Sequence, residues 1–202
     1  MPTLSQQYAR AIYAQIGERS PIVELTQAQA QALQAALAER HDGPVKVVIA
    51  MRYWHPLSEA AAAELAAFKP ERVVLLPLYP QFSTTTTASS LKAWRLAAAR
   101  VGLKAPTQAV CCYPDEAGFI AALCAGVAAG LRQVPQRQAS RVLFSAHGLP
   151  KRVIAEGDPY QRQVEATAAA IVARLAVADL DWAICYQSQV GPLEWIGPSL
   201  DD

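Results

Sequence analysis

One histidine of the chain follows a predicted strand directly, a position that suits a reactive side chain. The stretch RVLFSAHGLP (141–150) begins as an apolar strand and stops at His147, and Gly148 and Pro150 come just after it. A neutral imidazole can ligate a divalent metal or accept a proton near neutral pH. In open α/β sheets, ligands bind beyond the carboxyl ends of the strands. His147 is therefore a candidate metal ligand or base, and a histidine hydrogen-bonded within its turn is the open alternative.

Two further stretches follow predicted strands and carry side chains that could bind a ligand. MRYWHP (51–56) places His55 just beyond one strand, and LYPQFSTTTTASS (78–90) follows another. In the second stretch Tyr79 can form a wall for a flat apolar ligand, and the hydroxyl run from Ser83 can hold carboxylates. The alternatives are a turn histidine and a rigid loop that caps the next helix.

The cysteines and one aspartate favour structural roles. Cys111 and Cys112 are adjacent, so in a strand they would point to opposite faces. The sequence contains no CxxC pair, so neither a zinc site nor a thioredoxin-type site is indicated. Reduced cysteines packed as small hydrophobic side chains are typical of a cytoplasmic protein, which is our expectation. GDPY (157–160) predicts Asp158 as the N-cap of a helix and Pro159 as its first residue.

Helical and strand patterns alternate along the chain. Helices are predicted at 3–16, 27–40 (capped by Thr26), 59–68 (capped by Ser58), 89–102, 115–134 and 160–177. Short apolar strands are predicted at 46–51, 72–79, 107–113, 141–146 and 182–188. Strands that are apolar on both faces and alternate with helices predict an α/β fold, with parallel sheets covered by helices on both sides.

Composition excludes several classes of protein. The net charge is only +1, which gives no reason to expect a nucleic-acid partner. No apolar stretch reaches the roughly 18 residues of a membrane span, although a loose association with a membrane surface stays open. GxGxxG, P-loop, GxSxG and HExxH patterns are all missing from the sequence, which argues against nucleotide-binding, acyl-transfer and zincin functions. We expect no organic cofactor.

Taken together, these stretches resemble ferrochelatase, the enzyme that inserts ferrous iron into a porphyrin during haem synthesis. Five motifs carry the resemblance and keep the order of the family: YAQIGERSPI (13–22), MRYWHPL (51–57), LPLYPQFSTTTTASS (76–90), LFSAHGLP with GDPY (143–160) and YQSQVGPLEWIGP (186–198). They extend over nearly the whole chain.

The resemblance implies two similar Rossmann-like halves, 1–105 and 106–202, with a porphyrin cleft between them. It implies that His147 is the active-site histidine, which binds the incoming metal or takes pyrrole protons. Tyr13, Ser20 and Tyr113 fall where porphyrin-contacting residues of the family lie, and His55, Tyr79 and Ser83 would line or brace the cleft. Ferrous iron would be a substrate, with protoporphyrin or coproporphyrin as the acceptor.

The family pattern also extends beyond this sequence. The family has an N-terminal strand before the matched region and a second catalytic residue, a glutamate, after it, so we expect the chain to be a fragment. Without a cysteine-rich tail, no iron–sulfur cluster is expected. Two alternatives remain open: a porphyrin- or haem-binding module without turnover, and a related cobalt chelatase. The oligomeric state is not predicted.

Overall fold

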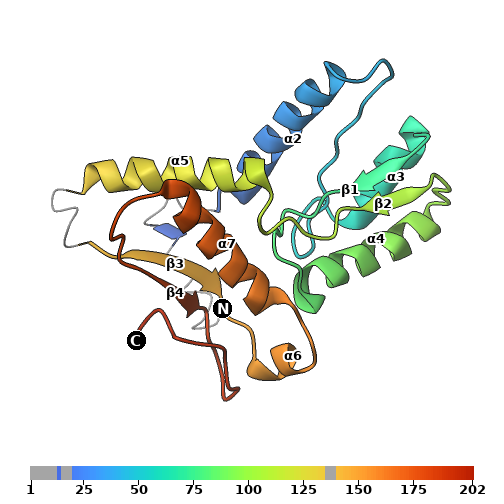
Figure 1. The fold of residues 1–202 in the computed structure, drawn as a ribbon. Coiled ribbons are helices and arrows are strands. Elements are labelled where there is room, and N and C mark those ends of the chain that lie inside the picture. Colours follow the sequence, from blue (N-terminus) through green and yellow to red (C-terminus); the bar gives the residue numbers. More distant parts are fainter. Residues whose placement is uncertain (1–12, 15–19, 135–139) are drawn as a thin grey trace. The chain divides into compact units, whose positions relative to one another are not determined.

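The structure is a computed structural model that describes residues 13–14, 20–134 and 140–202 of the chain. Helices and parallel strands alternate along it (Figure 1), which confirms the predicted α/β class. In chain order the elements are α2 (Ile22–Ala38), α3 (Ser58–Phe68), β1 (Val73–Leu75), the π-helical turn η1 (Thr84–Ala88), α4 (Ser89–Arg100), β2 (Thr107–Ala109), α5 (Ala117–Gln133), β3 (Val142–His147), α6 (Lys151–Ala155), α7 (Tyr160–Leu175) and β4 (Trp182–Gln187).

The chain forms two compact units. Unit 1 comprises Met1–Glu71 with Ala93–Ala105, and unit 2 comprises Arg72–Lys92 with Pro106–Asp202. The two-half division at residue 105 that the sequence suggests stays a prediction. None of the helices in the described parts of the chain is both long and apolar enough to cross a membrane.

Unit 2 contains two parallel strand pairs, β1 with β2 and β3 with β4. In the second pair Val142 lies opposite Trp182, and the register runs on to His147 opposite Gln187. The two strands therefore end together, as parallel strands joined by a crossover helix do. The side chains that follow β3 and β4 consequently lie at one edge of this sheet.

The core of unit 2 joins α5 and α7 to the β3–β4 pair. Ile120 and Cys124 of α5 pack with Ile171 of α7, and Phe144 of β3 lies against this cluster. A second cluster joins Val164 of α7 to Tyr186 of β4. Helix α7 thus buries its apolar face on the strand pair that ends at His147 (Figure 1).

Unit 1 is held mainly by the buried face of α3, and exposed ion pairs lie on its surface. Ala61, Ala62 and Leu65 of α3 are buried. Arg100 of α4 forms an ion pair of 3.0 Å with Glu59 of α3. Such exposed pairs add well under 1 kcal/mol each, so apolar burial contributes most of the stability of this unit.

The strands are shorter and more exposed than predicted. The strand expected at 46–51 is not formed: only Met51 makes a bridge, to Leu57, and the Val47 N–H donates to the Gln34 side chain at 2.8 Å instead of to a neighbouring strand. A strand needs a paired neighbour, and no described segment supplies one here. Burial on both faces is also wrong for two strands: β2 is exposed throughout, and β3 alternates between half-buried and exposed residues.

Three helix starts also differ from the prediction. Helix α2 begins at Ile22, and Thr26 lies within it, its hydroxyl donating to the Ile22 carbonyl oxygen at 2.6 Å, which is a common alternative use of a threonine. Helix α3 begins at Ser58 itself. Helix α5 begins at Ala117, two residues after the predicted start. Helix α7 begins at the predicted Tyr160, but its N-cap is Pro159, not Asp158, so Pro159 is not its first residue. The helix expected at 3–16 falls outside the described residues, apart from helical residues 13 and 14.

Candidate active site

The His147 side chain lies at the carboxyl end of β3 and is exposed. Val142, Phe144 and Ala146 of the same strand are half-buried, so the alternation of a strand turns His147 to the exposed side. The sequence prediction that an imidazole stands at a strand end is confirmed. Its function as a metal ligand or base stays a prediction.

The nearest polar partner of the ring fixes which nitrogen remains available. The Nδ1 atom lies 2.9 Å from the backbone oxygen of Gly148. A carbonyl oxygen can only accept, so in this contact Nδ1 carries the proton and donates it. In the neutral ring the lone pair then belongs to Nε2, which is the nitrogen that can ligate a metal or take a proton.

Gly148 is required by the close packing beneath this histidine. Its N–H donates to the Gln187 backbone oxygen at 2.8 Å, which extends the β3–β4 ladder by one bond. A Cβ at Gly148 would lie 3.1 Å from that oxygen and 3.3 Å from the Trp195 ring. Any larger residue would therefore push the chain, and His147 with it, away from β4.

The segment after β4 closes back on the His147 turn. The Ile196 N–H donates to the Leu149 oxygen at 3.0 Å, and the Gln189 side-chain amide donates to the Ile196 oxygen at the same distance. The Lys151 N–H donates to the Glu194 oxygen at 2.8 Å, so the residues on both sides of Trp195 are bonded to residues 149–151. The last two motifs of the sequence, which contain His147 and Trp195, thus pack together around the His147 turn.

A second polar cluster is centred on Asp158, which is 8% exposed. Its Oδ2 accepts hydrogen bonds from the Ser83 hydroxyl at 3.0 Å and from the Thr84 N–H and hydroxyl, both at 2.7 Å. Its Oδ1 accepts from the Tyr160 N–H at 3.0 Å. The sequence predicts only a helix cap, whereas this carboxylate also holds the hydroxyl-rich segment. In the sequence, the two partners of this contact stand in separate motifs, an aspartate in one and a run of hydroxyl residues in the other, and nothing links them.

These donors keep Asp158 ionised. Burial by itself raises the pKa of the carboxyl group, but the hydrogen bonds from Thr84, Tyr160 and Ser83 outweigh burial, so its pKa lies below the ordinary value. Burial raises the pKa of the neighbouring Tyr160 phenol, while a backbone hydrogen bond from His147 lowers it. Tyr160 therefore connects the Asp158 cluster to the backbone of the active-site candidate.

The hydroxyl-rich segment forms the turn η1, in which several hydroxyls point inward. The Ser83 oxygen accepts from the Thr85 N–H at 3.1 Å, so Ser83 caps the turn, and both Ser83 and Thr87 are fully buried. Ser83 thus braces this segment in the structure, and its predicted contact with a substrate stays a prediction. Thr84 and Thr85 are exposed.

Tyr113 and Tyr79 lie on one part of unit 2. The Tyr113 hydroxyl donates to the Pro77 oxygen and its N–H donates to the Pro80 oxygen, both at 2.8 Å, so Tyr113 lies along the segment that contains Tyr79. Burial raises the pKa of the Tyr113 phenol, which stays neutral. Tyr79 is 36% exposed.

The other predicted site residues belong to unit 1 and are exposed. Tyr13 is 40% exposed. The Ser20 oxygen accepts from the Ile22 N–H at 3.4 Å, just before α2. His55 precedes a cis peptide bond to Pro56, and its ring meets Trp54 edge-on at 5.8 Å. The convergence of these three residues with His147 stays a prediction.

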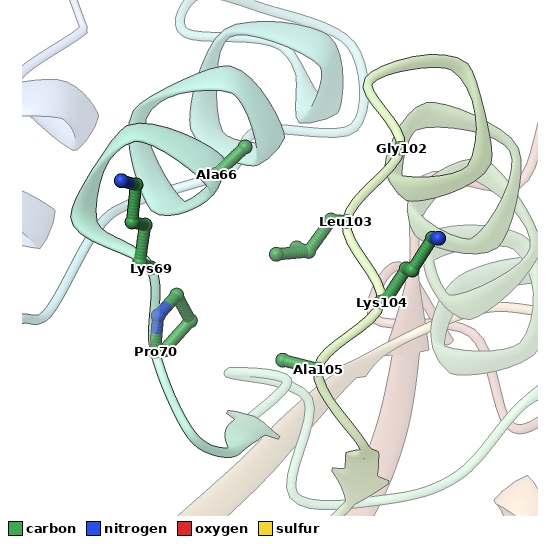
Figure 2. Close-up of a pocket in the computed structure, with 7 residues that line it drawn as sticks. All are labelled: Ala66, Lys69, Pro70, Gly102, Leu103, Lys104 and Ala105. Carbon is green, nitrogen blue, oxygen red and sulfur yellow. The ribbon is translucent and has the colours of Figure 1, made fainter.

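A pocket of unit 1 is not lined by any of these predicted residues. Figure 2 shows it between the ends of α3 and α4, lined by Ala66, Lys69, Pro70, Gly102, Leu103, Lys104 and Ala105. The Leu103 side chain points into it, and the ammonium groups of Lys69 and Lys104 point away. Among the described residues, His, Cys, Asp and Glu form no group of three that could hold a metal ion.

Comparisons with known proteins agree with the resemblance found in the sequence. The sequence model of the ferrochelatase family matches residues 2–202. A ferrochelatase of Caulobacter vibrioides is 52% identical over 201 residues, which cover 99% of this chain and 57% of the relative. Ferrochelatases of Phenylobacterium zucineum and Hyphomonas neptunium are 48% and 46% identical, over 99% and 100% of this chain and 57% and 54% of theirs. The chain thus spans little more than half the length of these relatives.

Proposed function

The chain belongs to the ferrochelatase family, and from this premise we propose that it carries the histidine-bearing part of a chelatase that inserts ferrous iron into a porphyrin. The reaction is a lyase-type metallation in haem synthesis. The observation that carries the proposal is the exposed His147 imidazole, whose Nδ1 is engaged by the Gly148 oxygen at 2.9 Å and whose Nε2 stays available.

The chemistry of metallation requires a nitrogen of this kind. A divalent ion must lose water before it enters the macrocycle, and two pyrrole N–H protons must leave. A neutral imidazole can do either task, because it is a borderline ligand that suits iron and zinc and a base with a pKa near neutrality. The hydrogen bond from Nδ1 to the Gly148 oxygen fixes the ring orientation, as the partners of the second ring nitrogen of metal-binding histidines do.

Unit 2 also offers a surface that suits a flat apolar ligand. Tyr79 is partly exposed, and Tyr113 lies along the same segment, bonded to the prolines on either side. Aromatic walls with a few polar groups are typical of sites for flat cofactors and substrates. We propose that these two tyrosines contact the porphyrin, together with Tyr13, Ser20 and His55 of unit 1.

The experiment compares porphyrin binding with metal insertion in the purified chain. A soluble porphyrin is titrated by fluorescence, and zinc insertion is followed by the change of the porphyrin spectrum. We expect binding and insertion by the chain, with insertion lost in His147→Ala. His41→Ala is the matched control, because His41 is an exposed histidine in the turn after α2, and it should retain the full rate.

Each other result would change the assignment. Insertion at the normal rate by His147→Ala would overturn the role of His147. Binding without insertion by the unaltered chain would favour a porphyrin-binding module. Faster insertion of cobalt than of ferrous iron under anaerobic conditions would favour a cobalt chelatase. Zinc affinity measured without porphyrin separates the two tasks, since only a metal ligand makes that affinity depend on His147.

A further inference from the structure

The adjacent Cys111 and Cys112 do not point to opposite faces, as their position in a predicted strand would require. Their sulfur atoms lie 2.8 Å apart. The reason is that β2 ends at Ala109, so both cysteines follow the strand in a segment without regular structure. The alternation of a strand therefore does not separate them, and two thiols are held in contact.

The surroundings make the two sulfurs chemically unequal. Cys111 is exposed, and Cys112 is half-buried. The Gln163 amide donates to the Cys112 sulfur at 3.7 Å. The hydrogen bond with Cys112, followed by burial and the charge of Cys112, raises the pKa of the Cys111 thiol. Cys111 consequently keeps its proton in the resting chain and is the more accessible of the two thiols, while the Gln163 amide donates to the Cys112 sulfur.

From this geometry we propose that Cys111 and Cys112 form a reversible dithiol–disulfide site that reacts with small-molecule disulfides, such as glutathione disulfide. The exposed Cys111 loses its proton to solvent base and attacks the reagent disulfide, which forms a mixed disulfide and releases one thiol when the departing sulfur takes up a proton. Cys112 then loses its proton in the same way and attacks the Cys111 sulfur, which breaks the mixed bond and releases the second thiol. In total the two cysteines lose two electrons and two protons, and one reagent disulfide becomes two thiols.

The remaining two cysteines provide internal controls. Cys124 and Cys185 are both buried, at 8% and 4% exposure. Their sulfurs lie against the backbone oxygens of Ile171 and Phe144, at 3.5 Å and 4.0 Å. Cysteines of this kind behave as small hydrophobic side chains and react slowly.

The position of the pair gives oxidation a consequence for the site, and this step rests on the proposed function. Cys112 directly precedes Tyr113, and the Gln163 that donates to Cys112 also accepts from the Phe82 N–H at 2.7 Å. Closing an S–S bond between adjacent residues must change the backbone that joins them. We therefore expect the oxidised chain to bind porphyrin about tenfold more weakly, a change of one power of ten in the dissociation constant.

The test uses the full chain, reduced and freed of reductant, then mixed with glutathione disulfide. Samples are alkylated at intervals, and the peptide that spans residues 111–112 is analysed by mass. We expect the peptide to lose two hydrogens without keeping glutathione. Cys112→Ser should stop at a mixed disulfide on Cys111, and Cys111→Ser should slow the reaction of Cys112 by about tenfold or more.

Two results would overturn the site. One is a stable mixed disulfide on Cys111 in the unaltered chain, because an adjacent Cys112 thiolate should displace it. The other is a reaction of the pair no faster than that of Cys124. A trivalent arsenical offers an independent check, since one arsenic atom should block both thiols in the unaltered chain and neither single variant should retain it.

Porphyrin titrations of the reduced and oxidised chain test the consequence separately. Equal affinities with the disulfide fully formed would overturn the coupling to Tyr113 and leave the site standing. Failure of both forms to bind porphyrin would count against the proposed function, because disulfide closure is scored by mass and needs no porphyrin.

Discussion

The His147 turn and the Asp158 cluster are both polar parts of unit 2, but they use their hydrogen-bonding atoms in different ways. The His147 ring is exposed and makes one hydrogen bond, to the oxygen of the next residue. Asp158 is 8% exposed, and its two oxygens accept four hydrogen bonds from Ser83, Thr84 and Tyr160. The His147 turn therefore keeps the lone pair of Nε2 available for a ligand, whereas the carboxylate oxygens of Asp158 already accept hydrogen bonds from the protein.

Under the proposed function, this difference separates a residue that acts on a ligand from a residue that holds the fold. A buried carboxylate with several donors stabilises the segments it joins, and removing its charge leaves those donors without an acceptor. An exposed imidazole with a free nitrogen adds little stability, so its position at a strand end needs another reason. We infer that Asp158 positions the η1 segment and the start of α7, while His147 acts on the substrate.

The largest expected effect comes from Asp158→Asn. The new amide has one acceptor oxygen, so its NH₂ group would lie either against the Thr84 N–H and the Ser83 and Thr84 hydroxyls or, after a flip, against the Tyr160 N–H. We expect the free energy of unfolding to fall by about 3 kcal/mol, measured by urea denaturation. Asp42→Asn is the control, because Asp42 is exposed in the turn after α2. Equal effects of the two substitutions would remove the distinction between the cluster and an ordinary surface carboxylate.

A second substitution tests the packing under the His147 turn. Gly148→Ala places a Cβ 3.1 Å from the Gln187 oxygen, and we expect a loss of about 2 kcal/mol in the free energy of unfolding. Gly126→Ala is a control with the opposite sign: Gly126 lies within α5 with nothing within 4 Å of an added Cβ. It should stabilise the chain by about 0.5–1 kcal/mol. An unchanged free energy of unfolding in Gly148→Ala would contradict this prediction, because it would show that the turn can move to accept the added Cβ.

Local patterns in the sequence were sufficient to predict most helices and the end of β3. Alanine-rich runs with caps predict α3, α4 and α5 to within a few residues, because helix formation depends mainly on neighbours along the chain. The apolar run before His147 likewise predicts a strand that ends at this residue. These features depend on residues that lie close together in the sequence.

Features that depend on distant partners could not be predicted in this way. The strand at 46–51 fails because pairing needs a neighbour that the pattern itself cannot supply. Asp158 and Ser83 are 75 residues apart, so neither motif reveals the bond between them. The contact of Cys111 with Cys112 depends on where β2 ends, and apolar composition predicts strand ends poorly.

The contribution of Asp158 to the free energy of unfolding should decrease gradually as the pH falls. Its pKa is lowered in the folded state, so its contribution to stability is complete above the unfolded pKa of about 4 and is lost as pH falls through the folded pKa. The difference in unfolding free energy between the unaltered chain and Asp158→Asn should be constant from about pH 7 to 5 and then narrow. The other carboxylates are the same in both chains, so their contributions to the pH dependence cancel in this difference. A difference that stays constant down to about pH 2 would contradict the lowered pKa.

The smallest effect on stability is expected at His147, where the effect on chemistry should be largest. Its ring belongs to none of the aromatic ring pairs of the described residues and makes one hydrogen bond, to the next residue. His147→Ala should therefore change the free energy of unfolding by no more than about 0.5 kcal/mol, while zinc insertion falls by about a thousandfold. Both quantities are measured on the same preparation, by urea denaturation and porphyrin absorbance. A loss of several kcal/mol would make His147 part of the scaffold, and the lost activity would then follow from unfolding rather than from a missing ligand or base.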